Sequence, residues 1–326
     1  MVFVTGGSGL IGSFLIAELL QQGYEVKALY RKQIPAIKGG ENVNWIEGDI
    51  LDPVLLRKEL AGVEYVVHSA GLVSYAPQDS ELLKQVNIEG TANIVDACLE
   101  TGITKLCHVS SIGAVGRPKG AKILTEENKW DAAEEHSAYA SSKYLGELEV
   151  WRGVAEGLKA VVVNPSIILG PADWNRSSTQ LFKYVFQERA FYTDGTANFV
   201  DLRDVVEAIM QLTFSDISGE RYILSGGQLS YKAFFDKVGL YFGKKAPGIK
   251  VPAAVAEVVW RFEYVRSLLT GKRPLITKDT ARVSVKTHKF SNEKVVKATG
   301  LKFRSLDETI AWSCEQLQKQ ELAAVR

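Results

Sequence analysis

Tyr139 and Lys143 form the pair of residues whose chemistry can be named first. Their spacing of four places them on one face of a helix predicted over residues 136–156. A phenol has an ordinary pKa of about 10, too high for easy proton exchange at neutral pH. An ammonium group beside it favours the phenolate, so we expect Lys143 to lower the pKa of Tyr139. Such a tyrosine can protonate a carbonyl oxygen or deprotonate an alcohol.

A third polar group, Ser111, directly follows a strand predicted over residues 105–109. In parallel sheets, residues that contact ligands gather at the carboxyl ends of the strands. The Ser111 hydroxyl is therefore a candidate hydrogen-bond partner for the same substrate oxygen. Taken alone, the Tyr139–Lys143 pair is weak evidence, because the same spacing also occurs on solvated helices.

A glycine-rich stretch, TGGSGLIG at Thr5–Gly12, follows an apolar strand predicted over residues 2–4 and opens a helix. The free N–H groups and the positive dipole end of a helix N-terminus form a site for a pyrophosphate. The glycines fit both G-x-G-x-x-G and G-x-x-G-x-x-G. The alternative is a glycine turn without a ligand, but the strand–turn–helix context favours dinucleotide binding.

The choice of dinucleotide depends on the end of the second predicted strand. Residues 26–40 contain no Asp or Glu, the residue type that holds the ribose of NAD, and carry Tyr30, Arg31 and Lys32 instead. A guanidinium there binds a 2′-phosphate, so we predict NADP. The alternative is a solvated loop edge, with both NAD and NADP bound. Asp49 either bonds the adenine amine or caps the helix that begins near Pro53.

Strands predicted over residues 2–4, 25–30, 43–47, 63–68, 105–109 and 160–163 alternate with helices, including residues 80–100 and 136–156. This pattern predicts an α/β fold, a doubly wound parallel sheet of the Rossmann type with about seven strands. Residues 205–212 and 222–224 are interpreted as a return to the sheet. We expect a nucleotide-binding domain over residues 1–169, with return segments around 197–225. Residues 170–326 then form a smaller, mostly helical substrate domain that interleaves with it.

Composition excludes several classes of partner. The chain carries 39 basic and 38 acidic residues, so neither nucleic acid nor an anionic membrane is expected. Its three cysteines have no metal-ligand spacing, so we expect no metal site, reduced thiols and a cytoplasmic location.

No signal peptide is expected, since the first strand begins at once. Charges interrupt the apolar stretch 251–269, so it should not span a membrane. We interpret this stretch as a buried helix or pocket lid, or alternatively as a membrane-surface or dimer contact.

Six motifs occur in one order along the first 210 residues, and a seventh stretch follows them near the C-terminus: TGGSGLIG, VNIEGT (86–91), HVSSIGAVG (108–116), YASSK (139–143), NPSIILGP (164–171), FVDLRDVVEA (199–208), and KFSNEKVVKATGLKFRSLDETI (289–310). The sequence resembles the extended short-chain dehydrogenase/reductase family. The resemblance implies that Tyr139 is the catalytic acid/base and that Lys143 tunes it and bonds the nicotinamide ribose. It also implies that Ser111 polarises the substrate oxygen and that Asn87 supports the site.

The same resemblance implies a homodimer, formed through the two long helices, and a set of cofactor-binding residues. That set is Gly6, Gly7, Ser8, Gly9, Leu10, Ile11, Gly12, Tyr30, Arg31, Asp49, Ile50, Ser69, Ala70, Gly71, Ser110, Tyr139, Lys143, Pro165 and Ser166.

Two motifs that other family members carry are missing here, and this narrows the class of substrate expected within the family. Ile112-Gly113 stands where 4,6-dehydratases carry an acidic pair, and Ala197-Asn198 stands where many nucleotide-sugar enzymes carry Arg-Asp. The sequence is instead similar to the dihydroflavonol reductase and 3β-hydroxysteroid dehydrogenase branches. We expect an NADP(H)-dependent oxidoreductase acting on a mostly apolar small molecule. The alternatives are an NAD(P)-retaining sugar epimerase and a non-catalytic NADP-binding sensor.

Five aromatic residues at the start of the substrate domain either line an apolar pocket for a ring compound or form ordinary core. They are Trp174, Phe182, Phe186, Phe191 and Tyr192.

Overall fold

A computed structural model describes residues 1–174, 178–252, 254, 255, 257, 258, 260, 261, 266 and 288–324. The strands are β1 (Val2–Thr5), β2 (Val26–Tyr30), β3 (Asn44–Glu47), β4 (Tyr65–His68), β5 (Lys105–Val109), β6 (Ile123–Leu124), β7 (Ala160–Pro165), β8 (Ile167–Leu169), β9 (Phe191–Tyr192), β10 (Thr196–Asp201), β11 (Glu220–Leu224), β12 (Gly227–Ser230), β13 (Ile249–Lys250) and β14 (Lys289–Phe290). The helices are α1 (Leu10–Gln21), α2 (Pro53–Leu60), α3 (Ser80–Lys84), α4 (Gly90–Thr101), α5 (Ala138–Ala155), α6 (Thr179–Phe186), α7 (Leu202–Thr213), α8 (Tyr231–Phe242), α11 (Glu293–Thr299) and α12 (Leu306–Ala324).

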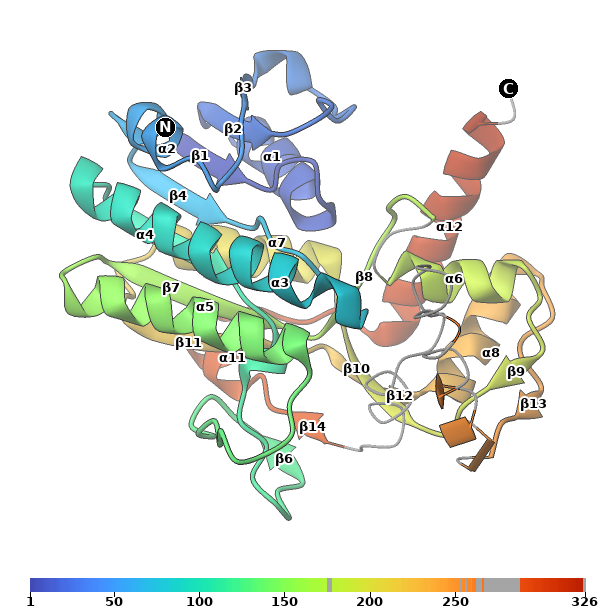
Figure 1. Cartoon of the computed structure of the whole chain (residues 1–326). Helices are drawn as coiled ribbons and strands as arrows, with labels where there is room; N and C mark the ends of the chain where they lie inside the picture. Colours follow the sequence, from blue (N-terminus) through green and yellow to red (C-terminus); the bar gives the residue numbers. More distant parts are fainter. Residues whose placement is uncertain are drawn as a thin grey trace.

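The main sheet has seven strands in the order β11-β7-β5-β4-β1-β2-β3, and every pair is parallel. Helices cover both faces (Figure 1), so β1, β5 and β7 are buried along their whole length. Alternate residues serve the two faces. Val2 and Val4 pack with α1 and α7, whereas Phe3 packs with α2 and α4. The predicted Rossmann-type fold is confirmed.

One predicted element was wrong and another differs in detail. Residues 80–100 form the predicted long helical segment, but a π-helical turn over Gln85–Glu89 lies within it, between α3 and α4. Residues 205–212 lie in α7 and add no strand, because their apolar side chains recur at helical spacing and pack against the sheet. Residues 222–224 do return to the sheet as predicted, within β11 beside β7.

The part of the chain after β7 builds a second, smaller layer around a three-stranded sheet, β12-β10-β8, and the helices α6, α8 and α12 (Figure 1). Its core is aromatic: Phe182 and Phe234 are fully buried, and Trp174 and Phe186 pack against the same cluster. Phe191 is 54% exposed and belongs neither to the core nor to a closed pocket. The domain boundaries themselves stay a prediction.

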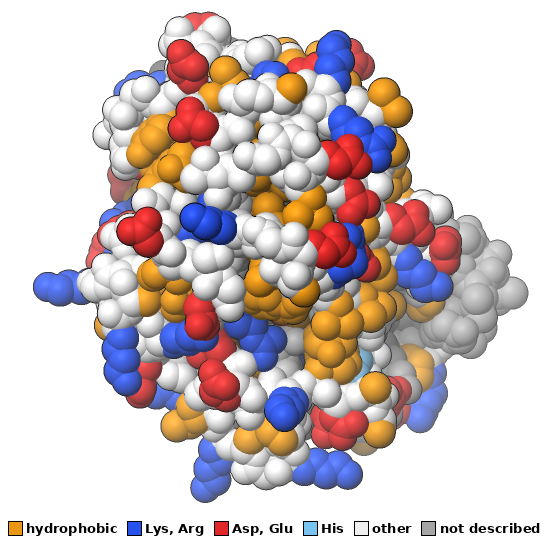
Figure 2. All heavy atoms as spheres, turned by 90° about the vertical axis from the view of Figure 1, so that its left-hand side faces the viewer, with side chains coloured by type: hydrophobic (Ala, Val, Ile, Leu, Met, Phe, Trp, Pro, Cys, Tyr) orange, Lys and Arg blue, Asp and Glu red, His pale blue; other side chains and the backbone are white. Residues whose placement is uncertain are grey.

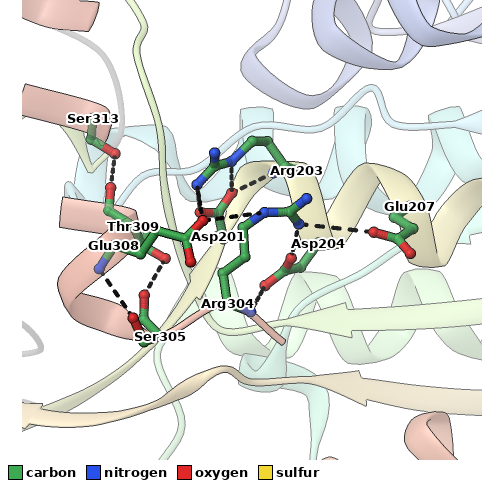
Figure 3. A network of polar contacts seen from close by, with 9 residues as sticks. All are labelled: Asp201, Arg203, Asp204, Glu207, Arg304, Ser305, Glu308, Thr309 and Ser313. Carbon is green, nitrogen blue, oxygen red and sulfur yellow. Dashed lines mark hydrogen bonds and ion pairs between the residues drawn. The ribbon is translucent and has the colours of Figure 1, made fainter. Parts of the chain in front are cut away.

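A network of charges joins α7 to the start of α12 (Figure 3). Asp204 is buried and accepts hydrogen bonds from the backbone N–H of Arg304, at 2.9 Å, and from its guanidinium. Asp201 caps α7 by accepting from the N–H of Arg203 at 2.7 Å. The Arg203 guanidinium lies 4.1 Å from the ring centre of Trp312 on α12. These contacts hold the C-terminal helix against the nucleotide-binding layer.

Most of the stretch 251–269 lies outside the described residues. Two of its described apolar side chains, Val255 and Val258, are 48% and 64% exposed, so the predicted burial is wrong at these two positions. Among the described residues, no helix has both the length and the apolarity to cross a bilayer. On the described part of the face in Figure 2, acidic and basic side chains are interspersed, as the near-zero net charge predicts.

We predict that Asp204→Asn lowers the free energy of unfolding by about 1–3 kcal/mol. This loss is smaller than the roughly 3–5 kcal/mol that is lost when one partner of a fully buried ion pair is removed, because the Arg304 side chain is 31% exposed. Urea denaturation measures it. The control Glu315→Gln, which breaks an exposed pair with Lys319, should change stability by less than about 0.5 kcal/mol. Equal losses in both variants would contradict the role of Asp204.

Candidate active site

The predicted site residues all come to the carboxyl-terminal edge of the main sheet or to the helices beside it. Gly6 to Gly12 follow β1, Tyr30 and Arg31 end β2, and Asp49 and Ile50 follow β3. Along the same edge, Ser69 to Gly71 follow β4, Ser110 and Ser111 follow β5, and Pro165 and Ser166 end β7. Tyr139 and Lys143 lie in the first turns of α5, and Asn87 lies in the π-helical turn.

The glycine turn is packed so tightly that side chains are excluded from it. A Cβ on Gly12 would lie 2.2 Å from the carbonyl oxygen of Gly6, and one on Gly6 would lie 2.6 Å from the amide nitrogen of Ala70. Gly6 also has φ of +70°, which favours glycine. Helix α1 starts with no side-chain cap and no acidic residue in its first turn. Its N-terminus therefore suits a pyrophosphate.

Tyr139 and Ser111 meet at this edge. The side chain of Tyr139 is buried beside the Ser111 hydroxyl. Gly113 lies behind both, since a Cβ there would be 3.4 Å from the Ser111 hydroxyl and 3.7 Å from the Tyr139 ring. Burial raises the pKa of Tyr139, and the neighbouring Ser111 hydroxyl offsets this only in part. The expected lowering of this pKa by Lys143 is therefore wrong for the protein alone, because desolvation disfavours the phenolate.

Lys143 lies one turn along α5 from Tyr139, and its ammonium donates to the backbone oxygen of Val109 at 3.0 Å. It also lies against Gly71, where a Cβ would be 3.1 Å from Nζ. Burial lowers the pKa of Lys143 to about 8, and the nearby carboxylate of Glu147 opposes the shift. The lysine is thus fixed between the loops that follow β4 and β5.

Asn87 supports this arrangement through hydrogen bonds to the loop after β4 and to α5. Its amide donates to the carbonyl of Leu72 at 2.9 Å and to Ser142 at 2.9 Å, and its oxygen accepts from the N–H of Leu72 at 2.8 Å. The π-helical turn directs this amide inward, toward the β4 loop. Asn87 therefore ties that loop to α5.

Sequence reasoning missed Glu147, which lies one turn beyond Lys143 and is 1% exposed. Asn164 donates its amide both to Glu147 and, at 2.9 Å, to the backbone oxygen of Ser111. The Arg221 guanidinium lies 3.5 Å from the second Glu147 oxygen. The signal was present, since Tyr139, Lys143 and Glu147 follow one another at intervals of four residues and share a helix face.

The Arg31 guanidinium lies 3.6 Å from the Asp49 carboxylate, and both side chains are largely exposed. The cap of α2 is Asp52, which accepts from the N–H groups of Val54 and Leu55, so capping by Asp49 was wrong. Asp49 instead accepts from the N–H of Leu51 at 3.1 Å. Arg31 is thereby held beside the end of β2.

The two histidines of the sheet are buried core residues. His68 bonds Thr5 at 2.7 Å and Thr91 at 3.1 Å. Burial lowers the pKa of His68 to about 3 and lowers that of His108 as well, so both rings are neutral. Within the described ranges, no three His, Cys, Asp or Glu residues are grouped to hold a metal ion.

Comparison with known proteins identifies the family. Residues 2–223 match the NAD dependent epimerase/dehydratase family. The chain belongs to this family. Its members include reductases, dehydratases and epimerases of the extended short-chain dehydrogenase/reductase type. These proteins are NAD(P)-dependent enzymes, and this protein is therefore an enzyme of that type.

Relatives cover almost the whole chain. A Synechocystis protein provisionally named dihydroflavonol 4-reductase is 29% identical, with 95% of this chain and 92% of that protein covered. Sterol demethylase protein B of Methylococcus capsulatus is 30% identical, with 76% of each covered. The crystal structure of gox2253 superposes on this family member with a TM-score of 0.82 at 28% identity and covers 98% of each chain.

We predict a pH-dependent difference in stability between the wild type and Lys143→Met. The folded pKa of Lys143, about 8, is below its ordinary 10.5, so the unfolded chain binds more protons between these values. Raising the pH through this window should stabilise the wild type relative to the variant by roughly 1.4 kcal/mol per pH unit at most. Urea denaturation at pH 7 to 10 measures it.

The exposed Lys84→Met, whose side chain is 62% exposed, is the matched control and should show no such trend. A difference between wild type and Lys143→Met that stays constant with pH would contradict the burial of the Lys143 ammonium.

Proposed function

We propose that the protein is an NADP(H)-dependent oxidoreductase that reduces a ketone or aldehyde of a mostly apolar small molecule. The observation that carries the proposal is the placement of the buried Tyr139 side chain beside the Ser111 hydroxyl, with the Lys143 ammonium one turn away, at the edge where the glycine turn ends. The fit to a dinucleotide rests on the uncapped start of α1 and on the buried Ser166 hydroxyl, which has no hydrogen-bond partner among the described residues.

The nicotinamide, when bound, supplies the hydride that reaches the carbonyl carbon. Ser111 holds the carbonyl oxygen, and Tyr139 donates its phenolic proton to that oxygen as negative charge develops there. The raised pKa of Tyr139 keeps this proton in place at neutral pH until the reaction requires it. Lys143 then stabilises the phenolate that remains.

The position of Asn198 argues against a nucleotide-sugar substrate. Its amide donates to the backbone oxygen of His288 at 2.7 Å, and its oxygen accepts from the N–H of Phe290 at 3.4 Å. This residue therefore anchors β14 and carries no cation for a diphosphate. The relative named dihydroflavonol 4-reductase supports a reductase in preference to an epimerase.

NADP selectivity is proposed from Arg31, whose guanidinium is exposed at the end of β2 and has only the exposed Asp49 as an ionic partner in the described part of the chain. A cytoplasmic homodimer also stays a proposal. Exposed leucines on the helices concerned, Leu82 on α3 and Leu145 and Leu148 on α5, support a dimer contact.

We expect Tyr139→Phe to lower kcat by about 10²–10⁴-fold while cofactor affinity is unchanged, because only the proton donor is lost. Absorbance at 340 nm with a panel of carbonyl compounds measures turnover. The control Tyr144→Phe alters a tyrosine of the same helix that stacks on Trp130, and it should keep full activity.

Full turnover by Tyr139→Phe would refute the assignment. Tightly bound cofactor with interconversion of sugar epimers and no net NADPH consumption would establish the epimerase instead. NADPH binding without turnover of any carbonyl compound would favour the sensor.

We expect Arg31→Ser to weaken NADPH binding about ten- to a hundredfold, the loss of one charge-assisted contact, and to change NADH binding little. Fluorescence titration with the two reduced cofactors measures both affinities. Lys38→Ser, an exposed cation before β3, is the control and should leave the ratio of the affinities unchanged. If Arg31→Ser also leaves that ratio unchanged, NADP selectivity does not arise from this residue.

A further inference from the structure

Arg117 is a charged residue near the candidate site that the proposed reaction does not use. It follows Ser111 by six residues, in the loop after β5. The chain on either side is firmly held. Val115 is buried in a cluster with Leu124 and Phe290. A Cβ on Gly116 would lie 1.9 Å from the backbone oxygen of Lys129, so the loop has no room to shift there.

The Arg117 guanidinium has no ionic partner among the described residues. It lies 5.9 Å from the centre of the Phe290 ring, and no described carboxylate is close enough to form an ion pair with it. The titratable groups whose charge acts on the pKa of Arg117 are the Tyr75 phenol and the Glu134 carboxylate, and both raise it. The side chain is partly buried, and burial lowers its pKa, yet a guanidinium remains protonated in proteins. A cation shielded from water without a counter-charge is unfavourable.

The surroundings of Arg117 connect it to the reacting groups. The Tyr75 ring, in the loop after β4, lies edge-to-face on the Tyr139 ring, with 5.5 Å between their centres. β4 and β5 are neighbours in the sheet, so the loops that carry Tyr75 and Arg117 emerge side by side. The Arg117 guanidinium also lies over the ring of Phe290 in β14, which pairs with β6. The guanidinium thus lies where the catalytic edge meets the C-terminal part of the chain.

We propose that Arg117 binds a carboxylate of the substrate, so that the compound reduced at Tyr139 is an acid with an otherwise apolar body. This inference rests on the proposed reductase function and adds the substrate class. A planar guanidinium matches a carboxylate through two parallel hydrogen bonds. One guanidinium balances one negative charge, which favours a carboxylate over a phosphate dianion. The Tyr75 ring, which is 36% exposed and packs on Tyr139, supplies apolar contact for the rest of the molecule.

The test uses matched carbonyl compounds that differ only in charge: 4-carboxybenzaldehyde with its methyl ester, and glyceraldehyde 3-phosphate with glyceraldehyde. We expect the wild type to reduce the acid with a kcat/KM about ten- to a hundredfold higher than the ester, the worth of one charge-assisted pair. Arg117→Gln should remove this preference by slowing only the acid, and Arg117→Lys should keep part of it. Lys119→Gln, an exposed cation of the same loop, should keep the full preference.

A purely structural role of Arg117 would slow the acid and the ester equally, and this result would overturn the proposal. Preference for the ester, or for the phosphate over the carboxylate, would overturn it as well. Melting temperatures of all variants identify any that fail to fold. If Arg117→Gln is among these, the preference of Arg117→Lys for the acid over the ester tests the proposal.

A binding measurement separates this inference from the proposed function. Calorimetry on Tyr139→Phe with oxidised cofactor compares 4-(hydroxymethyl)benzoate with its methyl ester. Binding of the acid that Arg117→Gln abolishes would support the carboxylate site even if no carbonyl compound is turned over. If carbonyl compounds are reduced but the acid binds no better than the ester, the carboxylate site fails and the reductase stands.

Discussion

Parallel strands bring their carboxyl ends to one edge of a sheet, and the candidate active site depends on this constraint. The glycine turn after β1, the Ser69–Gly71 loop after β4 and the Ser111 loop after β5 are far apart in sequence but adjacent at that edge. Contact between them is direct. Gly6 packs on Ser69 and Ala70, and Gly71 packs on the ammonium of Lys143. Helix α5 runs along one face of the sheet beside α4 (Figure 1), and its first two turns bring Tyr139 and Lys143 to this edge.

Within α5, burial and charge oppose each other. Tyr139, Lys143 and Glu147 are each less than a tenth exposed, and burial favours the neutral form of each. The structure offsets this with polar partners on neighbouring strands. Val109 accepts from the lysine, Asn164 donates to the glutamate, and Arg221 approaches the same carboxylate. Titratable groups whose pKa values have been moved by burial are characteristic of catalytic sites.

Local signals in the sequence predicted the sheet well, because each strand is a short apolar run between turns. The same signals failed where contacts between distant parts of the chain determine the local structure or the pKa of a side chain. Apolar periodicity through residues 80–100 predicted a helix, yet it did not predict the π-helical turn within that helix, from which Asn87 bonds the β4 loop. The pKa of Tyr139 was predicted from its neighbour on the helix alone, whereas burial by the rest of the fold determines its direction. Arg117 could not be singled out, since only the fold shows that no carboxylate of the described ranges pairs with this loop cation.

The pairing of β14 with β6 closes a long loop of chain. Lys289 lies beside Ile123, more than 160 residues earlier, and Asn198 and Gln228 both donate to the backbone oxygen of His288 just before it. A contact across so much chain can form only late in folding, after the strands on both sides of it are in place. During synthesis, the loop that carries Ser111 and Arg117 therefore remains without one of its walls until β14 has left the ribosome. A chain that stopped before β14 would hold its dinucleotide fold and still lack a finished substrate pocket.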